Sequence, residues 1–242
     1  MKARVPQLLL LQILQRLLAN HRVTGRPAVK YFSTNPRLCQ YLVIRKADSM
    51  ELRATPLWMT GIRSEDEREF VQVLGRAISG DISAFEQIVI RYERWVLNLA
   101  WRLLGNGEDA QDASQEVFMR AFRFLHKFDS TRPFEPWLIR LTVNVCRDIG
   151  RKRTVTVLLD ADAIQARSDP HMELSSEEQK AMLQKALQEL PEKERAAVVL
   201  RDIEGFSTAE VAEILGSSEA TVRSQISTAR LKISKALKRR RL

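Results

Sequence analysis

Guanidinium, ammonium and hydroxyl groups cluster near the C-terminus of this 242-residue chain. From Arg223 to Lys238 every charged side chain is a cation, and three further arginines follow. Guanidinium groups form bidentate hydrogen bonds with guanine, hydroxyls can contact either base edges or phosphates, and an unbroken basic run suits a phosphate backbone. The side chains that this pattern marks for base or backbone contacts are Thr221, Arg223, Ser224, Ser227, Thr228 and Arg230.

Two short helices joined by a tight turn are expected to position these groups. Ser207 and Glu210 have the spacing of a capping box, and Gly216 supplies the residue that most easily enters a left-handed turn. The expected inward positions are Val211, Ala212 and Leu215 in the first helix, and Val222, Ile226, Ala229 and Ile233 in the second. This is the pattern of a helix-turn-helix whose second helix enters a major groove. An ordinary helical hairpin with a solvated polar face is the alternative, and the basic run favours DNA.

A second cluster combines aromatic rings with cations around a turn in the middle of the chain. The aromatic members are Phe122, Phe124, Phe128, Phe134 and Trp137, and the polar members are Asp129, Ser130, Arg132, Arg140, Asn144, Arg147 and Arg151. Rings beside cations suit unstacked single-stranded bases and their phosphates. The alternative is that the rings form the core of a small helical domain. We expect that alternative for most of them, with Phe128 in the loop as the exception.

Helical periodicity in the surrounding residues predicts an all-α chain with two domains. The first domain spans residues 66–153 and contains four helices, the third from about Glu108 to Lys127 and the fourth from about Phe134 to Lys152. Its expected inward positions are Phe70, Val71, Leu74, Ala77, Ala84, Phe85, Ile88, Val89, Tyr92, Val96, Ala100, Leu103, Val117, Ala121, Phe124, Leu125, Trp137, Leu138, Leu141 and Val145. An acidic stretch without helical period, residues 154–175, is expected to be a flexible linker. Residues 176–242 form the second domain, with one helix from Ser176 to Leu190 and another from Pro191 to Ile203 before the helix-turn-helix.

The net charge of +9 is concentrated at the N-terminus and is not itself an argument for nucleic acid. Residues 1–58 carry ten basic and two acidic residues, a balance of 10 − 2 = +8, so only the local clusters point to an anionic partner. We expect this N-terminal extension to be disordered or weakly helical, or to reflect an upstream start codon. An organelle transit peptide and a membrane-surface helix are the alternatives.

Residue types that carry catalysis or bind metals show no recognisable pattern. Cys39 and Cys146 lie far apart, in no CxxC or Cys/His arrangement, and the three histidines are scattered. We therefore expect no metal, no cofactor, no small-molecule substrate and no catalytic activity, in a reducing cytoplasm.

The order of these motifs resembles the extracytoplasmic-function sigma factors of the sigma-70 family, over roughly residues 66–153 and 176–238. The similarity to region 2 lies in Gly80-Asp81, Ala84-Phe85, Arg91-Tyr92, Asp109, Asp112, Gln115-Glu116-Val117-Phe118, Ala121-Phe122, Phe128, Trp137-Leu138, Asn144 and Arg147-Asp148. The similarity to region 4 lies in Leu190-Pro191-Glu192, Arg195, Val199, Gly205, Ser207, Glu210-Val211-Ala212, Gly216 and Thr221-Val222-Arg223-Ser224. Residues 1–58 have no counterpart in the family pattern.

The resemblance implies a factor that binds core RNA polymerase and directs it to promoters. It assigns docking on polymerase to Asp109, Asp112, Gln115 and Glu116, capture of a flipped −10 base to the loop Phe128–Arg132 with Asn144, and the −35 element to the helix Glu219–Arg230. The alternative for Asp109, Asp112 and Glu116 is that they are ordinary acidic residues near a helix N-terminus, where a negative charge interacts favourably with the helix dipole. An anti-sigma partner, and through it an indirect link to a membrane, would accompany such a factor. A helix-turn-helix regulator that does not bind polymerase and an enzyme stay as rivals at this point.

Overall fold

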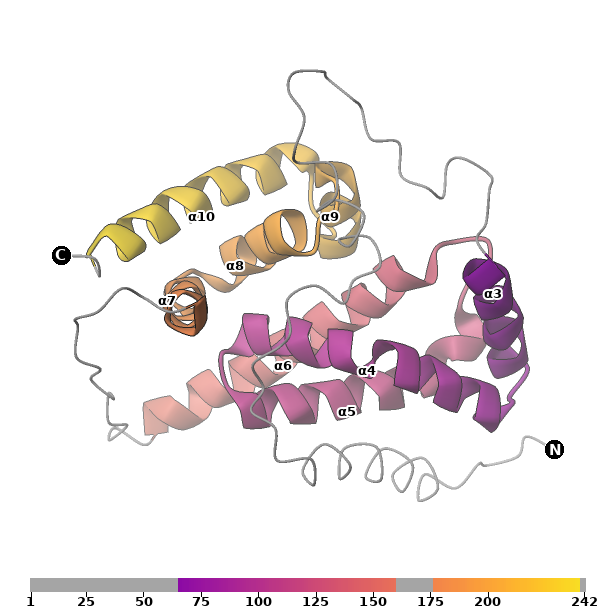
Figure 1. Cartoon of the computed structure of the whole chain (residues 1–242). Coiled ribbons are helices and arrows are strands. Elements are labelled where there is room, and N and C mark those ends of the chain that lie inside the picture. Colours follow the sequence, from indigo (N-terminus) through magenta and orange to yellow (C-terminus); the bar gives the residue numbers. More distant parts are fainter. Residues whose placement is uncertain (1–64, 160–175, 240–242) are drawn as a thin grey trace. The chain divides into compact units, whose positions relative to one another are not determined.

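A computed structural model describes residues 65–159 and 176–239, and every regular element in these ranges is a helix (Figure 1). The first range contains α3 (Glu65–Ile78), α4 (Ile82–Leu104), α5 (Gly107–Phe124), the 3₁₀ helix η2 (Leu125–Lys127) and α6 (Phe134–Leu159). The second contains α7 (Ser176–Gln188), α8 (Glu192–Val198), the π-helical segment η3 (Val199–Ile203), α9 (Thr208–Leu215) and α10 (Glu219–Arg239). The predicted all-α class is confirmed. The predicted extension, residues 1–58, and most of the predicted linker lie outside the described residues.

The described residues fall into two compact units, and the boundary between them passes through α4 and α5. Unit 1 comprises residues 65–94 and 118–132, and unit 2 comprises residues 95–117, 133–159 and 176–239. Unit 2 therefore joins the C-terminal half of α4 to α7–α10, although these elements are far apart in the sequence.

Unit 1 is held together by aromatic side chains from α3, α4 and α5. The Phe85 and Phe122 rings meet edge to face with centroids 5.0 Å apart, and the Phe70 and Tyr92 rings do so at 5.6 Å. Ring pairs in this geometry contribute about 0.5–1.5 kcal/mol beyond the area that they bury. The Arg91 guanidinium lies over the Phe70 ring, 4.9 Å from its centroid, and shields that ring from water.

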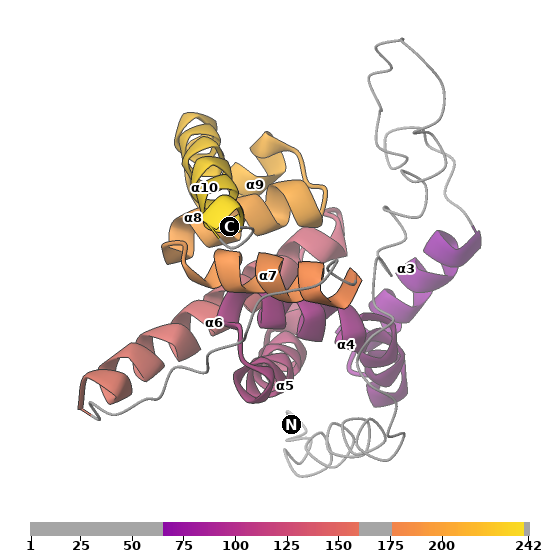
Figure 2. The same cartoon turned by 60° about the vertical axis from the view of Figure 1, so that its left-hand side comes forward.

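In unit 2, α10 packs along α8 and also contacts α7 and α9, as both views of the ribbon show (Figures 1 and 2). α9 in turn contacts α6 and η3. The side chains that fill the space between these helices include Leu187, Leu200, Phe206, Val211 and Val222, each at most 2% exposed. Burying an aliphatic side chain of this size stabilises a fold by about 1.5–3 kcal/mol, so these contacts fix α9 and α10 on their scaffold.

Most of the predicted inward positions are buried or half-buried, but two are exposed. Val71 is 46% exposed and Phe124 is 38% exposed, so these two predictions are wrong. In α3 the neighbouring Val73 is buried instead, because the helix turns the 73–74–77 stripe inward. Phe124 lies at the C-terminal end of α5, where the chain tightens into η2, and its ring is covered by the Lys127 ammonium at 5.7 Å.

Several helix boundaries also differ from the prediction. α6 continues to Leu159, seven residues beyond the predicted Lys152 and into the predicted linker. The predicted helix from Pro191 to Ile203 is α8 followed by the π-helical η3, and Pro191 is its N-cap rather than its first helical residue. The wider turn of η3 accommodates an extra residue, which sequence periodicity does not reveal.

Candidate nucleic-acid interface

Side chain to backbone hydrogen bonds cap the starts of α9 and α10, and Gly216 lies at the bend between them. Ser207 Oγ accepts from the Glu210 amide at 3.2 Å, and Glu210 Oε2 accepts from the Ser207 amide at 2.8 Å, which completes the predicted capping box. Gly216 has φ 62° and ψ 43°, so it supplies the left-handed residue that ends α9. Ser218 Oγ accepts from the Thr221 amide at 3.2 Å and caps α10. The predicted helix-turn-helix geometry is therefore confirmed.

The buried seam of α10 determines which of its side chains face outward. Val222, Ile226 and Ala229 are at most 6% exposed. Of the side chains predicted to contact the −35 element, all except the half-buried Thr228 are exposed, namely Glu219, Thr221, Arg223, Ser224, Ser227 and Arg230. The outward face at the start of α10 is therefore open to a duplex.

Several cations in the C-terminal half of α10 bind acids of the scaffold. Arg230 Nε and Nη2 donate to the two carboxylate oxygens of Asp202 at 2.8 and 2.6 Å, and these contacts raise the pKa of Arg230. Lys232 Nζ lies 2.8 and 2.9 Å from the two Glu194 carboxylate oxygens, and Arg239 lies 3.6 Å from Glu189. The sequence predicted a basic run directed at phosphates. In the structure these three cations form ion pairs with acids of α8, of η3 and of the residue that follows α7, and their contacts with phosphate stay a prediction.

Arg223 has a different kind of partner. Its Nη2 lies 2.6 Å from Glu219 Oε2, one turn earlier on the same helix, and both side chains are largely exposed. An exposed pair at this spacing contributes only about 0.3–0.5 kcal/mol, so a base or phosphate can displace the carboxylate at small cost.

The loop after η2 has an ordered, polar outer surface. Asp129 Oδ1 accepts hydrogen bonds from the Thr131 amide at 3.0 Å and from its hydroxyl at 2.6 Å, and these bonds lower the pKa of Asp129. Ser130 and Arg132 are exposed. The aromatic side chain of the loop, Phe128, is not part of this outer surface.

Phe128 is 8% exposed, so the prediction that it is the aromatic outside the core is wrong. Its amide donates to the Leu125 carbonyl at 3.0 Å, and this turn directs the ring into unit 1. The other rings mostly follow the structural alternative: Phe134 is buried and packs against Trp137 with centroids 5.4 Å apart.

One face of α6 brings together the remaining candidates for the −10 element. Arg140, Asn144, Arg147 and Arg151 follow one another at steps of four, three and four, and all but the half-buried Arg147 are exposed. Arg140 donates to the Glu213 carbonyl of α9, and Arg147 Nε lies 2.6 Å from Glu192 Oε1 at the start of α8. Two of the four polar side chains are thus engaged within the chain.

The acidic candidates lie at the start of α5. Asn106 Oδ1 caps this helix by accepting from the Glu108 amide at 2.9 Å. Asp112 is exposed, while Asp109, Gln115 and Glu116 are half-buried. Ala110, Ala113 and Val117 turn inward and leave these polar groups on one side of the helix.

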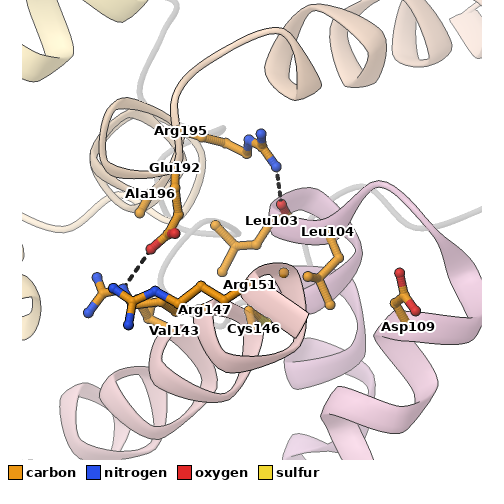
Figure 3. Close-up of a pocket in the computed structure, with 11 residues that line it drawn as sticks. Leu103, Leu104, Asp109, Val143, Cys146, Arg147, Arg151, Glu192, Arg195 and Ala196 are labelled. Carbon is orange, nitrogen blue, oxygen red and sulfur yellow. Dashed lines mark hydrogen bonds and ion pairs between the residues drawn. The ribbon is translucent and has the colours of Figure 1, made fainter. Parts of the chain in front are cut away.

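A cavity of about 360 Å³ in unit 2 lies between the end of α4, the middle of α6 and the start of α8 (Figure 3). Arg147, Arg151, Glu192 and Arg195 bring charged groups to its wall. Cys146 also lines it, and burial raises the pKa of its thiol to about 12, so the thiol stays protonated at neutral pH. In the described part of the chain no group of three His, Cys, Asp or Glu side chains has the arrangement of a metal site.

A buried acid near this cavity escaped the sequence analysis. Glu204 is 2% exposed and accepts hydrogen bonds from Trp95 Nε1 at 2.8 Å and from Arg102. The only signal in the sequence is a carboxylate directly after the apolar stretch of α8 and η3. Its partners are more than 100 residues away, and no periodicity identifies them.

Comparisons with known proteins agree with this geometry. Residues 88–156 match the family described as Sigma-70 region 2, and residues 180–233 match Sigma-70, region 4. The chain is 32% identical over 178 residues to the RNA polymerase sigma-H factor of Pseudomonas aeruginosa, covering 69% of this chain and 92% of that protein. It is 32% identical over 177 residues to the ECF RNA polymerase sigma factor SigM of Mycobacterium tuberculosis, covering 73% and 89%.

A similar solved structure is the sigma factor RpoE in complex with the anti-sigma factor NepR from Bartonella quintana. The identity is 26% and the TM-score 0.54, over 64% of this chain and 96% of that chain. None of the helices in the described ranges is long and apolar enough to cross a bilayer. With regions 2 and 4 in the expected order, this chain belongs to the extracytoplasmic-function sigma factors of the sigma-70 family and directs promoter-specific transcription.

Proposed function

We propose that the chain divides promoter recognition between the start of α10, which reads the −35 element, and the loop Phe128–Arg132 with α6, which binds the opened −10 element. The observation that carries this proposal is the outward face of α10. Arg223, Ser224 and Ser227 are exposed there, opposite a buried seam and next to a turn that Gly216 and the Ser218 cap fix. A rigid helix N-terminus with exposed polar side chains is the arrangement that a major groove accepts.

The −10 element is proposed to bind as separated strands. Asp129, Ser130 and Arg132 offer acceptors and donors at the loop surface, and Arg140, Asn144 and Arg151 offer two cations and an amide along α6. An amide can pair with the edge of an extruded base, and the arginines can hold the adjacent phosphates. Phe128 supports the loop from inside.

Core RNA polymerase is the proposed partner of the acidic face of α5. Asp112 is exposed, and Asp109, Gln115 and Glu116 flank it. Acids on this face repel naked duplex and favour a basic protein surface. Polymerase supplies the chemistry of RNA synthesis in the cytoplasm, and this chain supplies specificity and strand opening without a catalytic residue of its own.

An anti-sigma factor is a further proposed partner, because one accompanies the RpoE structure that this chain resembles. Any link to a membrane would run through that partner.

Run-off transcription with purified core polymerase tests the proposal. The full chain added to core should produce a transcript from a promoter with both elements, and scrambling either element should abolish it. Initiation that is independent of the −35 sequence would contradict the role of α10. A chain that binds duplex DNA but never joins polymerase would favour a simple helix-turn-helix regulator.

A further inference from the structure

Glu219 is the single acidic residue of α10, a helix whose other charged side chains are all cations. These cations are Arg223, Arg230, Lys232, Lys235, Lys238 and Arg239. A carboxylate beside DNA opposes the attraction between the cations and the phosphates, so an acid on a DNA-reading helix calls for a specific explanation. Glu219 lies in the first turn of α10, directly after the bend that follows α9 (Figure 1).

The Glu219 carboxylate is exposed, and only one of its two oxygens has a partner. Glu219 Oε2 accepts from Arg223 Nη2 at 2.6 Å, and the side chains of the two residues are 48% and 66% exposed. Glu219 Oε1 has no partner among the described residues, and neither do Nε and Nη1 of Arg223. One acceptor and several donors therefore lie side by side on the outer surface of α10.

The helix period places this pair on the face that we assign to the −35 element. Glu219, Arg223 and Ser227 follow one another at steps of four, and all three are exposed. The seam through Val222 and Ile226 is buried against the other helices. A duplex that meets Arg223 and Ser227 therefore also meets Glu219.

The base edges in the major groove determine which base a carboxylate can contact. Guanine presents the acceptors N7 and O6, and thymine presents the acceptor O4, so both repel a carboxylate oxygen. Cytosine N4 and adenine N6 are donors, but adenine also has the N7 acceptor beside its N6. A carboxylate therefore matches cytosine, just as a guanidinium matches guanine and an amide matches adenine.

We propose that Glu219 is a specificity-determining residue that accepts a hydrogen bond from N4 of a cytosine in the −35 element, beside the base edge that Arg223 reads. This inference rests on the proposed role of α10 and names the base that its first turn selects. The two side chains are 2.6 Å apart, and successive base pairs are stacked about 3.4 Å apart, so the pair fits one G·C pair or two adjacent pairs. The alternative is that Glu219 only stabilises the helix, through the helix dipole and its pair with Arg223.

Glu219→Gln tests the base assignment, because an amide of the same shape matches adenine instead of cytosine. Run-off transcription by the full chain with core polymerase measures the preference on promoters in which each −35 base pair is replaced in turn. At one position the preference for cytosine should fall about fivefold or more, and the preference for adenine should rise. Glu219→Ala should lose the cytosine preference without gaining one for adenine. An unchanged preference at every position in both variants would overturn the inference.

Glu194→Gln is the matched control. Glu194 also pairs with a cation of α10, because Lys232 Nζ lies 2.8 Å from its Oε1, but Glu194 itself belongs to α8. The substitution should leave every base preference unchanged, and circular dichroism checks that all variants keep their helices. A change as large as that of Glu219→Gln would show that losing any acid near α10 alters the reading, and it would overturn the assignment to cytosine.

A modified promoter separates a direct contact from an effect through Arg223. N4-methylcytosine at the selected position replaces the N4 hydrogen that faces the major groove and still pairs with guanine. The holoenzyme should bind this duplex about fivefold more weakly than the ordinary one, both with the wild-type chain and with Arg223→Ala. With Glu219→Ala the two duplexes should bind equally. Equal binding of both duplexes by the wild-type holoenzyme would refute the contact.

Arg223→Ala on the same promoters distinguishes failure of this inference from failure of the proposed function. If Arg223→Ala changes the base preference and Glu219→Gln does not, α10 reads the −35 element without Glu219, and only the inference fails. If neither variant changes the preference and scrambling the −35 element leaves transcription intact, the proposed role of α10 fails, and the inference fails with it.

Discussion

Both halves of α10 carry exposed arginines, but these arginines have different kinds of partner. Arg223 and Arg230 are 66% and 61% exposed, and each has a carboxylate 2.6 Å away. The partner of Arg223 is on the same helix one turn earlier, whereas Arg230 binds Asp202 of η3 through both nitrogens. An arginine with only a local partner loses little when DNA displaces that partner, whereas one with a bidentate partner on another element loses a contact between elements. The number of cations therefore says less about DNA binding than the location of their partners does.

Ile226→Ala is the change with the largest expected effect, because Ile226 belongs to the buried seam that holds both halves of α10 against the other helices. Ile226 is 6% exposed, and truncating a buried isoleucine costs about 2–5 kcal/mol. Thermal or denaturant unfolding of the chain measures the loss. Leu231→Ala is the control, since Leu231 is 62% exposed and its truncation should cost less than about 0.5 kcal/mol. Equal losses would show that the seam is misassigned.

Arg223→Ala should reduce promoter discrimination without unfolding the chain. A bidentate contact to guanine is worth about 1–3 kcal/mol of discrimination, which corresponds to a decrease of about 5-fold to 150-fold between matched and mismatched −35 sequences. Run-off transcription on a set of −35 variants provides the measurement. If the preference among these sequences is unchanged, the outward face of α10 does not read bases through Arg223.

Gly216→Ala should destabilise the turn that separates the two helices. The space around Gly216 is open, so the penalty comes from the left-handed backbone alone and should be about 1–2 kcal/mol. Gly107→Ala is the control, because Gly107 begins α5 with open space around it and without a positive φ. That change should be neutral or slightly stabilising in the same unfolding experiment. A Gly216→Ala protein as stable as wild type would mean that the turn is not required in this form.

Arg230→Ala has the smallest expected effect on stability, and it tests most directly whether Arg230 differs from Arg223. The loss of an exposed ion pair should cost about 0–1 kcal/mol in the free energy of unfolding. Promoter preference should stay the same, in contrast to Arg223→Ala, because Arg230 is committed to Asp202. Asp202→Asn should reproduce the stability loss. A change in −35 preference caused by Arg230→Ala would return this residue to the DNA-binding face.

Local patterns were sufficient to predict much of the fold. The capping box at Ser207, the stop at Gly216 and the stripe Val222–Ile226–Ala229 all depend on residues within a few positions of one another. Helix period and turn chemistry act over that range, so sequence reasoning identifies them. Phe124 and Phe128 were misassigned because their exposure depends on η2, a tightened turn that the helix period does not predict.

The roles of the −10, −35 and polymerase residues stay predictions from the family resemblance, although the structure shows which of them are accessible. Ser224, Ser227, Ser130, Asn144 and Asp112 are all exposed, as contact residues must be. The engagement of Arg140 and Arg147 inside unit 2 had no signal in their own neighbourhood of the chain, because their partners follow 73 and 45 residues later.

The sequence by itself determined the helices, their caps, the turn and the family, because each of these depends on spacing along the chain. Only the tertiary structure decided which charges are already paired. Asp202 and Glu194 reach α10 from 28 and 38 residues away, and Glu204 finds Trp95 and Arg102 across more than 100. Coulomb interactions and hydrogen bonds depend on distance in space, and that distance is known only after the helices have packed.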